Sequence, residues 1–110
     1  MFDTYEVSVK LVRAVHAIEP TIQRHDAALA DQLHRACMSI TLNVAEGSRS
    51  SPGNKRRHYI IAQGSAAEVK ACIDLAEVYG WIECPPELRE YIDRQLALLW
   101  SLTRPRRSRS

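Results

Sequence analysis

The sequence predicts an all-α protein, an antiparallel up-down-up-down four-helix bundle. Four stretches carry apolar residues three or four positions apart, which is the period of an amphipathic helix. Residues typical of turns separate these stretches, and none shows the sustained alternation of a β-strand. Helices joined by short connections pack as antiparallel neighbours. Residues 1–103 should therefore form the bundle, and residues 104–110 a basic, disordered tail.

The first helix should begin after Asp3, which with Glu6 gives a D-x-x-E pattern similar to a capping box. Its apolar stripe consists of Val7, Leu11, Ala14, Val15, Ile18 and Ile22. Pro20 lacks the amide hydrogen that a helix interior needs. We therefore expect a kink or an end of this helix near Glu19.

The second helix should begin at Asp26, because aspartate is a favoured N-cap. Its core stripe consists of Leu29, Leu33, Ala36, Cys37, Ile40 and Val44. Gly47 is the expected C′ residue, beyond the last helical turn. A smaller apolar patch on the opposite side of the helix consists of Met38, Leu42 and Ala45.

The third helix follows the turn SRSSPGN, where Ser51 or Asn54 is a suitable cap, and should stop at a second C′ glycine, Gly80. The segment WIECPPE then leads to the fourth helix, with Pro85 or Pro86 in its first turn. The fourth stripe ends before the tail and consists of Leu88, Tyr91, Ile92, Gln95, Leu98, Leu99 and Leu102.

Two apolar stripes lie on roughly opposite faces of the third helix, whereas a surface helix needs only one. The first consists of Ala62, Ala66, Val69, Ile73 and Ala76. The second consists of Ile60, Gly64, Ala67, Ala71, Leu75 and Val78. Either this helix is buried centrally in its own domain, or the second stripe packs against another subunit. We favour a homo-oligomer, with Met38 and Leu42 also in its interface, because the chain is too short to surround so long a helix.

The chain has a formal net charge of +2, but its basic residues are unevenly distributed. Acid-free segments hold eight of the fifteen basic residues, namely Arg49, Lys55, Arg56 and Arg57 in the turn before the third helix, and Arg104, Arg106, Arg107 and Arg109 in the tail. An alternating bundle brings both segments to one end. Such a cluster is typical of a nucleic-acid site, although a solvated turn and tail is the alternative. Few aromatic residues accompany it, so we expect little base stacking.

Several classes of protein have no support in the sequence. The sequence has no apolar run long enough to span a membrane, and we expect no signal sequence at its start. Three cysteines without a CxxC motif suit a reducing cytoplasm. We expect no metal, cofactor, small-molecule substrate or catalytic constellation. His34 and Cys37 stand at helical i, i+3 spacing and could pair a base with a thiol, but a buried cysteine beside a half-exposed histidine is the favoured interpretation.

Small polar residues lie beside the core stripes of the second and third helices: Ser39, Asn43, Ser65 and Glu68. Buried polar atoms must be satisfied by hydrogen bonds. We expect bonds from Ser39 or Asn43 to Ser65 or Glu68 that fix which helices pair and in what register. A functional pocket is the alternative.

Two motifs in these helices resemble a known family. The first is S-I-x-x-N-x-A-E-G, from Ser39 to Gly47, and the second is G-S-x-x-E, from Gly64 to Glu68. Both are similar to the bundle proteins encoded in intervening sequences of bacterial 23S ribosomal RNA genes. The accessory variability determinant proteins of diversity-generating retroelements resemble them too. The similarity covers roughly residues 5–100 and is strongest from Leu29 to Ile82.

The resemblance implies a small antiparallel bundle that tends to form pentameric rings. The retroelement members are non-enzymatic partners of a reverse transcriptase and its RNA, which they meet through a basic surface. An RNA-binding accessory protein is therefore the first expected function. The alternative is a structural or protein-interaction module, such as a reverse-transcriptase partner, without direct RNA binding. The arginine tail lies outside the shared core, so the resemblance assigns it no role.

Overall fold

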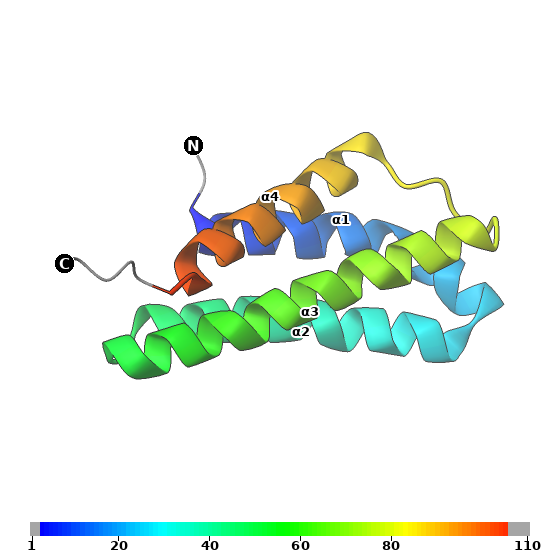
Figure 1. The fold of residues 1–110 in the computed structure, drawn as a ribbon. Coiled ribbons are helices and arrows are strands. Elements are labelled where there is room, and N and C mark those ends of the chain that lie inside the picture. Colours follow the sequence, from blue (N-terminus) through cyan, green and yellow to red (C-terminus); the bar gives the residue numbers. More distant parts are fainter. Residues whose placement is uncertain (1–2, 106–110) are drawn as a thin grey trace.

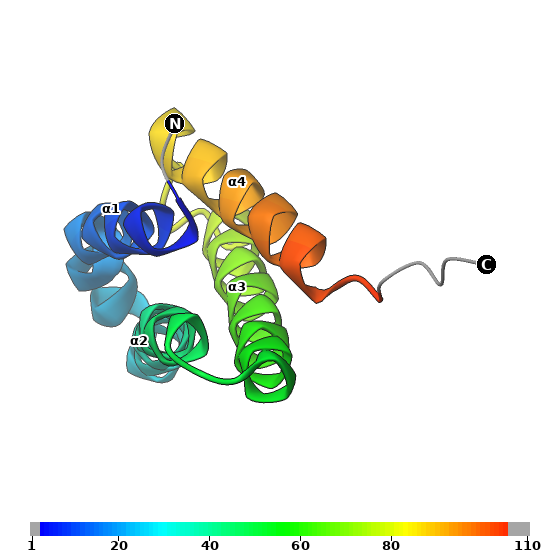
Figure 2. The same ribbon diagram turned by 90° about the vertical axis from the view of Figure 1, so that its left-hand side faces the viewer.

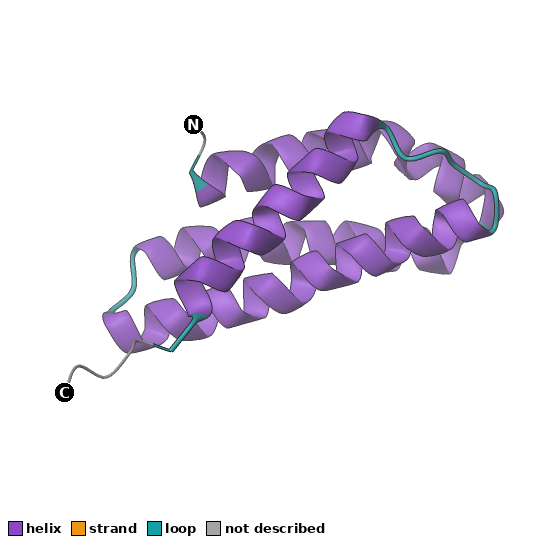
Figure 3. Cartoon of the chain, turned by 45° about the horizontal axis from the view of Figure 1, so that its top comes forward, coloured by secondary structure: helices purple, strands orange, loops and turns teal. Residues whose placement is uncertain are grey.

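The computed structural model describes residues 3–105, which are all-α, with four helices and no strand (Figure 1). The helices are α1 (Thr4–His25), α2 (Ala27–Ser48), α3 (Pro52–Val78) and α4 (Pro86–Thr103). Nearly all of the described chain is helical, and the connections lie at the ends of the bundle (Figure 3). None of the helices in this range combines the length and the apolar character that crossing a membrane requires.

The start of α1, the α2–α3 turn and the end of α4 lie at one end of the bundle, and the other two connections lie at the opposite end (Figure 1). α2 packs against α1 and α3, and α4 packs against α3 and α1. Seen from the first end, the four helices surround a common centre (Figure 2). This arrangement is compatible with the predicted up-down-up-down order.

Aspartate caps fix the starts of the first two helices, as predicted. The Asp3 carboxylate accepts a hydrogen bond from the Glu6 amide at 2.8 Å, and the Asp26 carboxylate accepts one from the Leu29 amide at 3.0 Å. The prediction that α1 could end near Glu19 is wrong, because the helix continues to His25 with Pro20 inside it. Pro20 removes a single backbone hydrogen bond, and its ring is exposed to solvent.

Gly80 ends α3 as predicted, with a φ of 75° that suits glycine. The Gly80 amide donates to the Glu77 carbonyl, and the Trp81 amide donates to the Ala76 carbonyl, each at 2.9 Å. This pair of bonds is a Schellman motif, which satisfies the last carbonyls of the helix. At the other end of α3, Ser51 is the N-cap residue by its backbone and Pro52 takes the first helical position.

The predicted core stripes face the centre of the bundle. The side chains of the first α3 stripe are buried, and so are most of those in the stripes of the other helices. The second α3 stripe faces solvent: Ile60, Leu75 and Val78 are 43%, 46% and 81% exposed. Central burial of α3 within its own domain is therefore wrong, because its neighbours α2 and α4 leave this face uncovered.

Candidate nucleic-acid interface

At the end of the bundle that holds the α2–α3 turn, an arginine of α3 binds the last residue of α4. The Arg56 guanidinium donates two hydrogen bonds to the Thr103 carbonyl, from Nη2 at 2.9 Å and from Nε at 3.2 Å. This carbonyl belongs to the last turn of α4, where carbonyls lack helical partners and the helix dipole favours a cation. The Thr103 hydroxyl also donates to Gln63 Oε1 at 2.7 Å. The first half of α3 is therefore bound to the residue that precedes Arg104.

We call this end, with its exposed basic residues, the basic end. Its members within the described chain are Arg49, Lys55, Arg56, Arg57 and Arg104, and all five are exposed. None of them forms an ion pair with a carboxylate of residues 3–105. The predicted tail residues Arg106, Arg107 and Arg109 lie outside the described residues. The sequence thus correctly predicted that the turn and the start of the tail lie near each other.

An exposed aromatic side chain accompanies the cations. Trp100 lies three residues before Thr103 and is 54% exposed. The Arg104 guanidinium carbon stands over the indole ring, 4.4 Å from its centroid, which is a cation–π contact. A shallow depression nearby along α3 is lined by Pro52, Gly53, Arg56, Arg57, Ile60 and Ile61. The basic end therefore combines free positive charge with flat and apolar surface.

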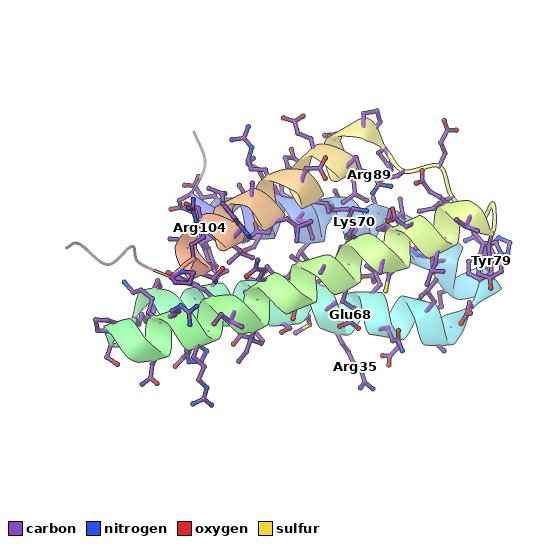
Figure 4. All side chains as sticks on the ribbon, in the orientation of Figure 1. Arg35, Glu68, Lys70, Tyr79, Arg89 and Arg104 are labelled. Carbon is purple, nitrogen blue, oxygen red and sulfur yellow. The ribbon has the colours of Figure 1, made fainter. Side chains whose placement is uncertain are left out.

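At the opposite end, two cations, Lys70 and Arg89, are paired with acids. Arg89 donates to Asp74 at 2.9 Å and to Glu77 at 2.8 Å, and Lys70 also donates to Asp74, at 2.8 Å. Figure 4 shows Lys70 and Arg89 together on this half of the molecule and Arg104 at the far end of α4. The hydrogen bond from Lys70, helped by Arg89, holds the pKa of the Asp74 carboxyl below its usual value.

Polar side chains connect α2 to α3, as predicted for Ser39, Asn43 and Ser65. The Ser65 hydroxyl donates to Ser39 Oγ at 2.7 Å, across the two helices. Asn43 Nδ2 donates to the Ser39 carbonyl and hydroxyl, so Asn43 Oδ1 is the acceptor for His58 Nδ1–H at 3.0 Å. Glu68 is exposed, and among the described residues it has no hydrogen bond to α2. The expected role of Glu68 in this contact is therefore wrong.

Gly47 is a contact residue, and its prediction as a C′ residue is wrong. α2 continues to Ser48, and Gly47 is buried against the start of α3. A Cβ on Gly47 would come within 2.7 Å of Tyr59 Cε1 and within 3.3 Å of His58 Cβ. Only glycine lets α2 and α3 approach this closely beside the Tyr59 ring, because any side chain would force the ring to move.

His34 and Cys37 do not form a base–thiol pair. His34 is exposed and donates to the Glu19 carboxylate at 3.4 Å, whereas Cys37 is buried. Burial raises the pKa of the Cys37 thiol to about 12, with smaller contributions from Glu19 and Cys72. The thiol therefore stays protonated at neutral pH and packs in the core, in agreement with the favoured interpretation.

The predicted oligomer-interface residues are all exposed and lie on two helices. Met38 and Leu42 on α2 are 46% and 61% exposed, and the α3 members are Ile60, Gly64, Ala67, Ala71, Leu75 and Val78. A Cβ on Gly64 would meet no atom of residues 3–105 within 4 Å. Contacts within the chain therefore give no reason for glycine at this position.

Three residues of this region were not singled out by the sequence patterns. His58 binds Asn43, Tyr59 covers Gly47, and Trp100 stacks with Arg104. A histidine or a tyrosine in a helix gives no signal of its partner across the bundle. The i, i+4 spacing of Trp100 and Arg104 was the one signal available, because such pairs share a helix face.

The two family motifs meet in space as well as matching in sequence. Ser39 and Asn43 of the first motif and Ser65 of the second form the hydrogen bonds between α2 and α3, and Gly47 allows their close approach. The family described as 23S rRNA-intervening sequence protein matches residues 1–99. No curated protein matches the chain. Because the match spans nearly the whole chain, the protein belongs to the family of 23S rRNA-intervening sequence proteins.

Proposed function

We propose that this protein is a non-enzymatic, cytoplasmic accessory protein that binds RNA through its basic end and acts as a homo-oligomer. The observation that carries the proposal is the set of five exposed cations, none paired with a described carboxylate, gathered just after α2, in the first turns of α3 and at the end of α4. Guanidinium groups match phosphate oxygens in charge and geometry. An up-down-up-down bundle presents all of these groups in one direction.

Contacts to phosphates should give affinity with little sequence selectivity, because they carry no base information. In a closed ring, every subunit would present its basic end on the same side, so that the local potentials add. The family resemblance favours a ring of five copies. Arg106, Arg107 and Arg109 would then extend the charge of each subunit beyond Arg104.

Binding of single-stranded RNA at low salt tests the RNA part of the proposal. Deleting residues 104–110 should weaken binding, and so should changing Lys55, Arg56 and Arg57 to Gln. The two changes together should nearly abolish it. If wild type binds no RNA at low salt, or if both variants bind as wild type does, the basic end is not an RNA site.

The exposed stripe of α3 supports assembly. It places apolar and small side chains along one side of the helix, and its only glycine, Gly64, has open space beside it. Glycine in a helix interior lowers the stability of the fold by about 1 kcal/mol relative to alanine. A glycine at such a position is therefore expected to have a packing reason. Close approach of a second copy along this stripe is such a reason.

A charge placed in the stripe tests assembly. Ala67→Glu or Ala71→Glu should dissociate the oligomer while the monomer stays helical, because an interface that buries an unpaired carboxylate is strongly destabilised. Ala97→Glu on exposed α4 is the matched control and should leave assembly unchanged. Light scattering at micromolar concentration measures the molar mass of each variant in solution. A wild-type chain that runs as a monomer would remove the oligomer from the proposal.

The same stripe favours a second candidate function, a structural or protein-interaction module such as a partner of a reverse transcriptase. This function needs the apolar α3 surface and not the cations. It predicts that Ala71→Glu abolishes binding of the protein partner, whereas neutralising the basic end leaves that binding unchanged. It becomes the better account if wild type assembles but binds no RNA.

A further inference from the structure

Trp100 differs from the other tryptophan of the chain in what covers it. At the opposite end, Trp81 stacks with Tyr79 at 4.8 Å between ring centroids and with His25 at 5.4 Å, both nearly parallel. Trp100 has a single stacking neighbour among the described residues, the Arg104 guanidinium, and half of its surface is exposed. The ring of Trp100 is therefore accessible to a ligand, whereas that of Trp81 is covered by its neighbours.

Trp100 also has a fixed position relative to the cations. Its helix ends three residues later at the carbonyl that accepts both hydrogen bonds from Arg56. The Thr103 hydroxyl that donates to Gln63 lies 3.3 Å from the Trp100 carbonyl. The ring is therefore held one turn from a bound arginine, and the free Arg104 lies against it. Aromatic rings beside cations form the surface on which single-stranded nucleic acids bind.

We infer that Trp100 is a stacking platform for an unpaired base of RNA, with Arg104 and the other cations of the basic end on the adjoining phosphates. The inference rests on the proposed RNA binding and adds to it a preference for unpaired strands. A base in a duplex has both faces covered by its neighbours, so only an unpaired base can stack on the indole. The expectation of little base stacking rested on the small number of aromatic residues near this end, and the exposure of Trp100 there argues against it.

The geometry of the Arg104 contact supports a flat ligand. The guanidinium is planar, and its carbon lies 4.4 Å from the ring centroid without an ion pair to a described carboxylate. A nucleobase presents a similar flat face and can stack on the indole. Tyr59, which also lies near this end, is buried against Gly47 and cannot offer its ring to a ligand. Tyr5, at the start of α1, is 48% exposed, but no described cation lies over its ring.

The test compares two strands of equal length and charge, a single-stranded RNA of about twelve nucleotides and its abasic counterpart. Stacking on one aromatic ring is worth roughly 5- to 150-fold in affinity. Wild type should therefore bind the RNA more tightly than the abasic strand by a factor in this range. Trp100→Leu should remove the difference and leave the affinity for the abasic strand unchanged. Tyr79→Leu, which removes an exposed ring at the opposite end, should leave the difference intact.

Fluorescence gives a second readout that needs no change at Trp100. In Trp81→Phe, Trp100 is the only tryptophan, and the RNA should quench its emission whereas the abasic strand should not. Equal affinity of wild type for both strands, with no quenching, overturns the inference and leaves phosphate binding intact. Absence of binding to either strand overturns the proposed function itself. A change of assembly in Trp100→Leu, with RNA binding unaltered, would make Trp100 a protein contact and also overturn the inference.

Discussion

The two ends of the bundle hold their helices together by different means. At the opposite end, Arg89 and Lys70 are neutralised by Asp74 and Glu77, so these two cations are used within the fold, whereas Arg24 donates only to Thr21 among the described residues. At the basic end, the Gly47–Tyr59 contact and the His58–Asn43 hydrogen bond join α2 to α3, and the cations form no ion pair with a described acid. Arg56 is bound to a carbonyl, which orients it without cancelling its charge.

This difference separates structural charge from available charge. A cation that faces a carboxylate contributes to stability and little to the external potential, whereas an unpaired one attracts a polyanion. Counting basic residues along the sequence cannot make the distinction. Whether a cation is paired depends on where the acids lie. In α3 the acids lie only in its second half, because the segment from Gly47 to Ala67 has none.

The largest expected effect concerns the packing of the basic end, compared between two glycines. In the Ala71→Glu background, where the proposed assembly is absent, Gly47→Ala and Gly64→Ala both gain helix propensity, so the difference in their free energies of unfolding reports the contact with Tyr59. Gly47→Ala should be less stable than Gly64→Ala by about 1–3 kcal/mol, the usual range for overpacking. Urea denaturation measures both. Equal stabilities would mean that Gly47 is not required for the approach of α2 to α3.

A smaller effect is expected at the opposite end, where Asp74 pairs with Lys70 and Arg89. Because the pKa of Asp74 in the folded state lies below its ordinary value of 3.8, its stabilising contribution is present above that pH and is lost as the pH falls further. Asp74→Asn should lower the free energy of unfolding by up to about 1 kcal/mol at pH 6, since exposed pairs are screened by solvent.

The control for this effect is Asp93→Asn, which removes an exposed carboxylate that has no ion pair in the described chain. Thermal melts from pH 6 down to pH 3 should show the gap between wild type and Asp74→Asn closing as the pH falls. Asp93→Asn should show no such closing gap. If Asp74→Asn and wild type melt alike at every pH, the ion pairs do not secure this end.

The fold was predictable from the sequence to a large degree, because helix periodicity, aspartate caps and a C′ glycine are local signals. Gly80 and Gly47 show the limit of such signals. Both precede turn-like segments, yet Gly80 has the positive φ of a C′ residue and Gly47 lies inside a helix against a ring twelve residues away. Only the packing of α2 on α3 distinguishes them.

The candidate site was predictable in its charge and not in its surface. Arg56 and Arg104 converge as the alternating topology predicts. The Arg56 contact with the Thr103 carbonyl, the partnership of His58 with Asn43 and the exposure of Trp100 depend on side-chain geometry across helices. No spacing along one helix specifies such contacts.

The salt dependence of RNA affinity tests the central claim most directly. Changing Arg49, Lys55 and Arg57 to Gln neutralises the basic end and leaves Arg56 on the Thr103 carbonyl. Changing Arg13, Arg24 and Arg94 to Gln lowers the net charge equally at other exposed positions. Each neutralised single-strand phosphate contributes about −0.7 to the slope of log affinity against log salt. The slope of the basic-end variant should therefore be less negative than that of wild type by up to about 2, while the control variant keeps the wild-type slope. Equal slopes for the two variants would contradict the account, because the charge would then act without regard to its place.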